Sequence, residues 1–556
     1  MTEVWAPYAS SVLLDANGTR TPMVRGDGGW WRSAEPLPPG TDYGFVLDGS
    51  DDVLPDPRSP RQPDGVHGRS RTVDHAAFAW TDAGWSRPPL AGAVVYELHV
   101  GTFTPEGTFD AAIAHLPHLA NLGVTAVELL PVNAFPGTHG WGYDGVGLWA
   151  PHEPYGGPDG LKRLVDACHA AGLAVVLDVV YNHLGPSGNY LGRFGPYFTD
   201  RYRTPWGPAV NYDDEGSHEV REFVVGNARM WVRDYHVDGL RLDAVHAIFD
   251  QSATHVLEEL TARVDAWVIA ESDLNDPRVV TPRGPRNGLG CDAQWSDDFH
   301  HALHAALTGE RDGYYADFGP LAHVAKALEG AYVYDGQHSA YRGRRHGRPV
   351  ADLPATAFLG YLQDHDQVGN RALGERSSHL LSPGLLKVGA ALVLTAPFVP
   401  MLFMGEEWGA STPWQYFTDH DDPGLADAVR KGRREEFRAF GWDPDDVPDP
   451  QDPATFARSR LRWDEVTEPA HADLLDWHRR LIALRRGVPA LTDGCLAQAT
   501  FDEAARTLVV ERGDVVVLAN LGGEPRTFDA AGEVLLASAA YDGGVLPGES
   551  VAILRR

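Results

Sequence analysis

An arginine and an aspartate stand two positions apart in the segment DGLRLDAVHAI, residues 238–248. A glycine followed by alternating residues predicts a short strand, on which Arg241 and Asp243 share one face and the leucines share the other. A cation beside a carboxylate keeps that carboxylate ionised, as a carboxylate nucleophile requires. The pair could equally be a structural ion pair at a strand end, because such pairs occur in large domains.

Other apolar segments also end in acidic or polar residues. Glu271 follows the run WVIA, Asp366 ends the segment FLGYLQDHD, and the run AVVLDVV leads into Asn182-His183. If the apolar runs are strands of one parallel barrel, side chains at their carboxyl ends converge on a single mouth. Three separate strands would then bring Glu271 and Asp366 together with Asp243, which favours a catalytic cluster over a structural ion pair.

Several carboxylates without a reactive thiol, a phosphate-binding loop or a series of metal ligands indicate cleavage of a glycosidic bond. One carboxylate attacks the anomeric carbon, a protonated one donates to the leaving oxygen, and a third can bind hydroxyls of the distorted sugar. Asp243 fits the nucleophile, because Arg241 lowers its pKa. Glu271 fits the acid, because an apolar run and nearby carboxylates raise its pKa. A separation of about 5 to 5.5 Å between these two carboxyls would predict retention of anomeric configuration.

Aromatic residues near the expected mouth could offer stacking surfaces to sugar rings. For each of them, packing within the barrel or its loops is an equally good explanation. They are Trp141 and Tyr143 in HGWGYDG, Tyr155, Trp295, Trp408 and Trp414.

The composition describes a large acidic chain of 556 residues, with 43% hydrophobic residues and a formal net charge of -30. This composition supports a large core, and the most apolar stretch is too broken to predict a membrane span. The acidity disfavours nucleic acid and anionic membranes as partners. Cys168, Cys291 and Cys495 have neither disulfide nor metal-site spacing, and no secretory signal pattern is visible. These features predict a cytoplasmic location.

The elements that must position the candidate residues alternate from Val94 onward. Near-continuous apolar runs predict buried strands, and amphipathic segments between them predict helices. The pattern is typical of an α/β fold in which a parallel (β/α)8 barrel, a TIM barrel, forms the centre. The predicted strands are VVYELHV, AVELLPV, AVVLDVV, GLRLDAV, WVIAES, CDAQWSD, FLGYLQDHD and FVPMLFMGEE.

Short alternating runs flank the predicted barrel on both sides. Runs such as SVLLD and TDYGFVLDG, with turns at Asn17-Gly18 and Asp27-Gly28, predict a small N-terminal β-sandwich. Near the other end, LVVERGDVVVLANL and SVAILRR predict a small β domain. We therefore expect an immunoglobulin-like β-sandwich over residues 1–88, a barrel with loop insertions over 89–488, and a C-terminal β domain over 489–556.

Four short segments resemble the conserved regions of the α-amylase family of retaining glycosidases, in their usual chain order: DVVYNH, GLRLDAVH, VIAES and LQDHDQVGN. The resemblance implies that Asp243 is the nucleophile, Glu271 the general acid/base, and Asp366 the carboxylate that stabilises the transition state. It also implies a subsite for the attacked glucose and further substrate contacts. These residues are Tyr143, His183, Arg241 and His365 in the subsite, with Trp141, Gln367 and Asn370 as further contacts.

Longer segments are similar to a narrower family, the maltooligosyltrehalose trehalohydrolases. They include VYELHVGTFTPEGTFDAAI, AESDLNDPRVV, QWSDDFHHALH and PMLFMGEEWGASTP. This likeness implies hydrolysis of the α-1,4 bond next to a terminal trehalose unit, with maltooligosyltrehalose and maltooligosaccharides as the sugars bound. It also implies a companion synthase that makes the trehalose end, and it implies no cofactor.

The chain departs from the α-amylase pattern beside His365, where Asp364 replaces the usual asparagine. The acid could raise the pKa of His365, or it could take the same hydrogen bonds as an amide. Asn182 corresponds to a calcium ligand in many relatives, but its companion ligands cannot be identified in the sequence. We therefore expect no bound metal.

His300 and His304 lie one helical turn apart in WSDDFHHALH, a spacing that also occurs in zinc sites. A helix with Ser296 or Asp297 as its N-cap explains the segment better, because acids are favourable near a helix N-terminus.

The same segment follows the sixth predicted strand, so its side chains could face the leaving-group side of the sugar. Asp298, His300 and His301 are the expected contacts there. His246 points away from Asp243 in ideal strand alternation, but the strand ends near it. We therefore list His246 among the expected substrate contacts while keeping the opposite orientation open.

Two other functions remain open on the sequence alone. A branching-type glucan transferase would use the same carboxylates but pass the glycosyl group to another sugar, and analysis of the products separates it from a hydrolase. A noncatalytic glycan-binding protein is disfavoured because the three carboxylates and Arg241 are all present.

Overall fold

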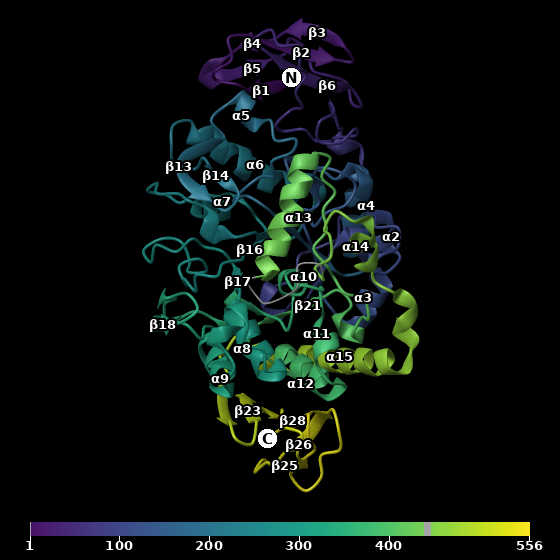
Figure 1. The fold of residues 1–556 in the computed structure, drawn as a ribbon, viewed down its shortest axis with the longest axis vertical. Helices are drawn as coiled ribbons and strands as arrows, with labels where there is room; N and C mark the ends of the chain where they lie inside the picture. The colour runs from purple at the N-terminus through teal and green to yellow at the C-terminus, as the bar shows by residue number, and fades with distance from the viewer. Residues whose placement is uncertain (1, 439–445) are drawn as a thin grey trace.

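The computed structural model describes residues 2–438 and 446–556. The N-terminal strands lie at one end of the long axis of the molecule and the C-terminal strands at the other, with the barrel between them (Figure 1). Among the described residues, no helix is long and apolar enough to cross a membrane.

Eight parallel strands form a closed barrel in which each strand pairs with its neighbours in sequence, so the last strand meets the first. All eight predicted strands are found, and the predicted fold class is confirmed. The barrel strands are β8 (Val95–Leu98), β9 (Ala126–Leu129), β12 (Ala174–Val179), β15 (Gly239–Leu242), β16 (Trp267–Ala270), β17 (Ala293–Trp295), β20 (Phe358–Gly360) and β21 (Val399–Phe403).

Alternation along the barrel strands separates an inner from an outer set of side chains. Leu240 and Leu242 belong to the large core outside the barrel, which they share with the surrounding helices. Val176, Ile269 and Trp295 belong to a second apolar cluster, which fills the barrel interior. The same inward series continues towards the carboxyl ends of the strands, where polar and charged residues replace the apolar ones.

Helices follow most of the barrel strands, as the amphipathic segments predict. The amphipathic segment over residues 109–123 forms two helices rather than one, α2 (Phe109–Ile113) and α3 (Leu116–Leu122). Pro117 lies in the first turn of α3 and has no N–H to donate to the preceding turn, which explains the break. The longer helices are α4 (Gly157–Ala170), α6 (Ser217–Tyr235), α8 (Asp297–Thr308), α12 (Pro383–Leu394), α13 (Pro423–Arg438) and α15 (Pro469–Gly487).

Antiparallel sheets flank the barrel. The N-terminal sheets have the orders β1-β5-β4 and β3-β2-β6-β7, and the main C-terminal sheet has the order β22-β23-β24-β28-β26. The expected limits at residues 88 and 488 stay a prediction. The N-terminal strands are β1 (Glu3–Trp5), β2 (Val12–Ala16), β3 (Thr19–Pro22), β4 (Val24–Arg25), β5 (Trp30–Arg32), β6 (Asp42–Leu47) and β7 (Ser70–Arg71); the C-terminal ones are β22 (Gln498–Asp502), β23 (Thr507–Arg512), β24 (Val515–Asn520), β26 (Glu533–Ala537) and β28 (Ser550–Arg555).

Candidate active site

Arg241 lies at the centre of the charged layer inside the barrel and is almost fully buried. Its Nη1 donates to Asp178 Oδ2 and to Asp243 Oδ1, both at 2.8 Å, and its Nη2 lies 3.5 Å from Glu271 Oε2. The guanidinium also lies over the Trp295 ring, 4.3 Å from its centroid. One cation therefore connects carboxyls delivered by β12, β15 and β16.

Asp243 follows β15 directly, and both of its carboxyl oxygens accept hydrogen bonds. Oδ1 is bound by Arg241, and Oδ2 accepts from Asn182 Nδ2 at 2.7 Å. Burial alone would raise the pKa of Asp243, but the charges of Arg241 and His183 and the hydrogen bond from Asn182 hold it below its ordinary value. Asp243 is therefore ionised over the physiological pH range.

Glu271 follows β16 and has the opposite electrostatic balance. Its pKa is raised well above the ordinary value, chiefly by burial; Arg241 opposes this shift, while the negative charges of Asp243, Asp297 and Asp366 add to it. The backbone N–H of Ala244 donates to Glu271 Oε2 at 2.5 Å. Ala244 is a non-glycine residue at φ 40 and ψ 53, so a strained left-handed turn aims this amide at the acid.

Asp366 lies in the short helix α10 (His365–Gly369), which follows β20. Its side chain is exposed, and Oδ1 accepts a hydrogen bond from Asn370 Nδ2 at 2.6 Å. A hollow of about 650 Å³ opens beside this pair, because Asn370 lines it together with Tyr314 and Arg371.

Asp364 caps the N-terminus of α10. Its Oδ1 accepts from the backbone N–H groups of Asp366 at 2.8 Å and Gln367 at 3.0 Å. Burial has the largest effect on Asp364, and together with the nearby negative charge of Glu97 it raises the pKa of this carboxyl well above its ordinary value. Oδ1 of Asp364 thus accepts the two backbone hydrogen bonds that an asparagine could also accept at this position.

His365 belongs to a chain of polar contacts that leads from the barrel interior to the mouth. Its Nδ1 lies 2.5 Å from Glu97 Oε1, and its Nε2 lies 2.8 Å from the Tyr143 hydroxyl. Tyr143 donates in turn to Asp178 Oδ2 at 2.6 Å. Burial would lower the pKa of His365, but Glu97 outweighs it and raises that pKa to about 10. His365 is therefore a cation at neutral pH.

Other predicted contacts lie around this cluster. His183 is stacked against the half-exposed Trp206, with ring centroids 4.2 Å apart. Trp141 is stacked on Trp414, with ring centroids 4.5 Å apart, and its Nε1 donates to a backbone carbonyl. A Cβ at Gly369 would lie 2.0 Å from the Trp141 ring, so this contact requires glycine. Packing therefore explains the position of the Trp141 ring, and its contact with substrate stays a prediction.

Two predicted substrate contacts need correction. Asp298 is 1% exposed, and its Oδ2 accepts from Asn275 and from the backbone N–H groups of Val333 and Tyr334, each at 2.8 Å. His300 is 0% exposed, and both ring nitrogens are bonded within the protein, to the Leu362 carbonyl and the Tyr315 hydroxyl. The polar atoms of both side chains are therefore used in hydrogen bonds to segments packed around α8, and neither side chain is available to a sugar.

His301 and His246 are less constrained. His301 lies among Tyr314, Tyr315 and Phe318. His246 lies beyond the Ala244 turn, with Nε2 3.9 Å from Asp273 Oδ1. Contact of either histidine with substrate stays a prediction. Within the described ranges, no group of three or more His, Cys, Asp or Glu side chains has the geometry of a metal site.

Asp297 is a mouth residue that the sequence analysis assigned only to a helix cap. It continues the inward series of Ala293 and Trp295, whereas Asp298 takes the outward position. The charge of Asp297 also acts on Glu271. Asp297 could have been predicted as a mouth residue by following every second residue from Ala293 through Trp295 past the end of β17.

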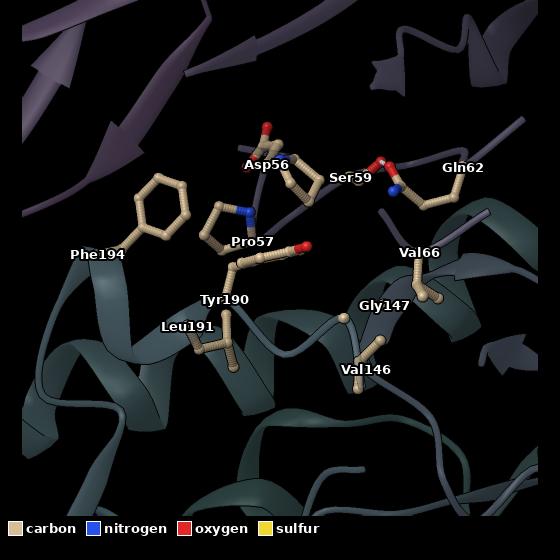
Figure 2. A pocket seen from close by; sticks show the side chains of 12 residues that line it. Asp56, Pro57, Ser59, Gln62, Val66, Val146, Gly147, Tyr190, Leu191 and Phe194 are labelled. Carbon is tan, nitrogen blue, oxygen red and sulfur yellow. Dashed lines mark hydrogen bonds between the residues drawn. The ribbon is translucent and has the colours of Figure 1, made fainter. Parts of the chain in front are cut away.

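A separate cavity of about 350 Å³ lies between residues 55–66 and the segment 188–194 (Figure 2). Pro57, Tyr190 and Phe194 give it largely apolar walls, and the polar side chains of Ser59 and Gln62 bond to each other at 2.6 Å. None of the three candidate catalytic carboxylates lines this cavity.

Comparison with known proteins gives a consistent result. A family model for the alpha amylase catalytic domain matches residues 67–204, and a model described as Domain of unknown function (DUF3459) matches residues 494–553. A malto-oligosyltrehalose trehalohydrolase from Rhizobium sp. (strain M-11) is 52% identical, over 100% of this chain and 97% of that protein. A 1,4-alpha-glucan branching enzyme from Vibrio parahaemolyticus is 36% identical, over 75% of this chain and 59% of that enzyme. A crystal structure of a Salmonella typhimurium protein provisionally named an alpha amylase has a TM-score of 0.93 and 39% identity, and covers 100% of this chain and 97% of that one.

Proposed function

Because the chain belongs to the family of maltooligosyltrehalose trehalohydrolases, we propose that it hydrolyses the α-1,4-glucosidic bond next to the terminal trehalose of maltooligosyltrehalose and releases trehalose. The observation that supports this chemistry is that two carboxyls beside the Arg241 guanidinium have pKa values shifted in opposite directions. Arg241 contacts both Asp243 and Glu271, yet the pKa of Asp243 lies below its ordinary value and that of Glu271 well above it. Such a pair is suited to supply an anionic nucleophile and a proton donor at the same pH.

The first half-reaction follows from these two states. Asp243 attacks the anomeric carbon of the glucose unit while Glu271 donates its proton to the glycosidic oxygen, so trehalose leaves and a glycosyl-enzyme forms. Glu271 is then an anion. In the second half-reaction it takes a proton from a water molecule, which attacks the same carbon and releases the remaining oligosaccharide with retained configuration.

Asp366 has the environment of a substrate-binding carboxylate rather than of an acid or a nucleophile. It is exposed, and Asn370 orients one of its oxygens from within the same short segment. The other oxygen, Oδ2, accepts no hydrogen bond from the described residues, which leaves it for sugar hydroxyls of the transition state. Both ring nitrogens of His365 are engaged, by Glu97 and by the Tyr143 hydroxyl, so contact of His365 and Tyr143 with the same glucose stays a prediction from the family likeness.

Incubation with maltopentaose and with its trehalose-capped counterpart tests this function. We expect trehalose as the released sugar from the capped substrate, and much slower release of any product from maltopentaose. New branch points in amylose, without trehalose release, would instead identify a branching-type transferase. Asp243→Asn is the control, because any product that it still forms at the rate of the unaltered enzyme does not come from this site.

The source of the substrate is a further part of the proposal. We infer that a companion synthase makes the trehalose end and that the two enzymes act in sequence without a need to bind each other; the family likeness supports this inference. Cys168, Cys291 and Cys495 are free thiols, which supports a cytoplasmic site of action. A coupled reaction with a purified synthase and maltopentaose should yield trehalose only when both enzymes are present.

A further inference from the structure

Asp297 stands at the rim of the barrel between two of the candidate catalytic carboxyls. The barrel order β16-β17-β20 places the end of β17 between those of β16 and β20. Glu271 follows β16 and Asp366 lies just beyond β20, while Asp297 is two residues past Trp295, the last residue of β17. Three adjacent strands therefore deliver three carboxyl groups to the same side of the mouth.

A single hydroxyl fixes the orientation of Asp297. Tyr361, which is fully buried at the end of β20, donates to Asp297 Oδ1 at 2.5 Å. The register between the two strands makes this contact, because Trp295 pairs with Leu359 and the two side chains lie two residues further along each strand. Oδ2 of Asp297 accepts no hydrogen bond from the described residues, so no second donor neutralises this carboxyl.

The groups that face Asp297 are acids. Asp273 from the loop after β16, Asp366 from α10, and Asp298 from its own helix all act on it. Burial, the largest cause, and these charges raise the pKa of Asp297 to about 7, while the Tyr361 hydrogen bond opposes the shift. Asp297 thus begins to carry a negative charge near neutral pH, where a glycosidase of this kind must keep its acid protonated.

We propose that Asp297, held by Tyr361 between the other two carboxyls, is a positioning residue that keeps Glu271 in its proton-donating form. This proposal rests on the proposed function, because it takes Glu271 to be the general acid. Arg241 favours the ionised form of Glu271, whereas Asp243, Asp297 and Asp366 favour the protonated form. Asp243 and Asp366 both act on the sugar directly, whereas Asp297 adds its charge to theirs from outside the reacting pair while Glu271 waits to donate.

Asp297→Asn tests the proposal, because asparagine keeps an acceptor oxygen for Tyr361 and removes only the charge. We expect the basic limb of the kcat/KM profile, which reports loss of the Glu271 proton, to move down by about one pH unit. Above that limb, kcat/KM should fall about tenfold relative to the unaltered enzyme. The substrate is trehalose-capped maltopentaose, assayed by its disappearance between about pH 5 and pH 10.

Asp292→Asn is the matched control. Asp292 precedes the opposite end of the same strand, where its Oδ2 accepts from the backbone N–H of Val268 at 2.8 Å, and asparagine can keep that bond. Its pH profile should superimpose on that of the unaltered enzyme. Tyr361→Phe should move the basic limb in the same direction as Asp297→Asn but less far, because Asp297 then ionises at higher pH.

A basic limb of Asp297→Asn that coincides with that of the unaltered enzyme would overturn the proposal and leave Asp297 a partner of Tyr361 only. Thermal unfolding of each variant shows whether the fold is kept, and Tyr361→Phe carries the test if Asp297→Asn is unstable. The rate of substrate disappearance gives the basic limb of the kcat/KM profile whatever product is formed. The identity of the product separately tests whether trehalose is released. The two proposals can therefore fail separately.

Discussion

The two ends of the barrel both contain buried carboxylates beside histidines, but they use them differently. At the amino ends of the strands, His169 on α4 lies between Asp238 and Asp82, with N–O distances of 3.0 and 2.9 Å. Asp238 also accepts from Trp85 Nε1 on Oδ1 and from the Val175 backbone N–H on Oδ2, both at 2.8 Å. Both oxygens of Asp238 are therefore occupied by protein donors.

At the carboxyl ends of the strands, fewer of the carboxyl oxygens are bonded to protein donors. Glu271 and Asp366 each keep one oxygen that accepts no hydrogen bond from the described residues, and the pKa values of Asp243 and Glu271 are displaced in opposite directions. Buried charge alone therefore does not distinguish a catalytic cluster from a structural one. The difference lies in neighbouring acids whose pKa values are displaced in opposite directions and, at Glu271 and Asp366 though not at Asp243, in an oxygen that the described residues leave unbonded.

The largest effect should come from Asp243, the proposed nucleophile at the mouth. Asp243→Asn keeps the shape of the side chain but removes the charge that forms the glycosyl-enzyme, so kcat should fall by at least about 10,000-fold. Steady-state assays with trehalose-capped maltopentaose measure the loss, and circular dichroism checks the fold. Retention of more than about one per cent of the activity would assign the nucleophile elsewhere.

The next largest effect should be on stability, at the opposite end of the barrel. Asp238→Ala leaves the Trp85 indole, the Val175 N–H and Nε2 of His169 without their acceptor, so the free energy of unfolding should fall by about 3 to 5 kcal/mol. Urea unfolding measures this change, while kcat at 25 °C should stay within about twofold because the mouth is untouched. A loss of kcat with unchanged stability would contradict the comparison.

The same cluster should make stability depend on pH. Burial would lower the pKa of His169, but the hydrogen bonds and charges of Asp238 and Asp82 outweigh it and raise that pKa above 6.5. The stabilisation is fully present below the unfolded value and is lost as the pH rises through the folded one. His169→Gln should therefore flatten the decline of Tm on the alkaline side. An unchanged decline would mean that His169 is neutral in the folded protein.

The smallest effect should come from Asp364, a mouth residue whose Oδ1 accepts from two backbone N–H groups of α10. Asp364→Asn replaces a carboxyl whose pKa is raised well above its ordinary value with an amide that can accept hydrogen bonds from the same two backbone N–H groups. We expect kcat/KM at neutral pH to stay within about threefold of the original value. A tenfold loss would show that Asp364 is ionised beside His365, the alternative that the sequence left open.

The fold and the carboxylates could be predicted from the sequence because each depends on local pattern. Eight apolar runs predict eight strands, and Arg241 beside Asp243 predicts an ionised acid. The error at Asp298 arose where a strand passes into a helix, since neighbouring residues there face opposite directions. The hydrogen bonds of His300 depend on Leu362 and Tyr315, which lie far away in the chain. No local pattern reveals such contacts.

The left-handed turn at Ala244 determines which oxygen of the acid delivers the proton. Its amide hydrogen and the Arg241 guanidinium both approach Oε2, and two positive partners disfavour a proton on that atom. The proton therefore resides on Oε1, the oxygen without a protein donor. If Glu271 is the acid, the backbone amide that follows Asp243 therefore sets which of its oxygens would protonate the departing sugar, before any substrate enters.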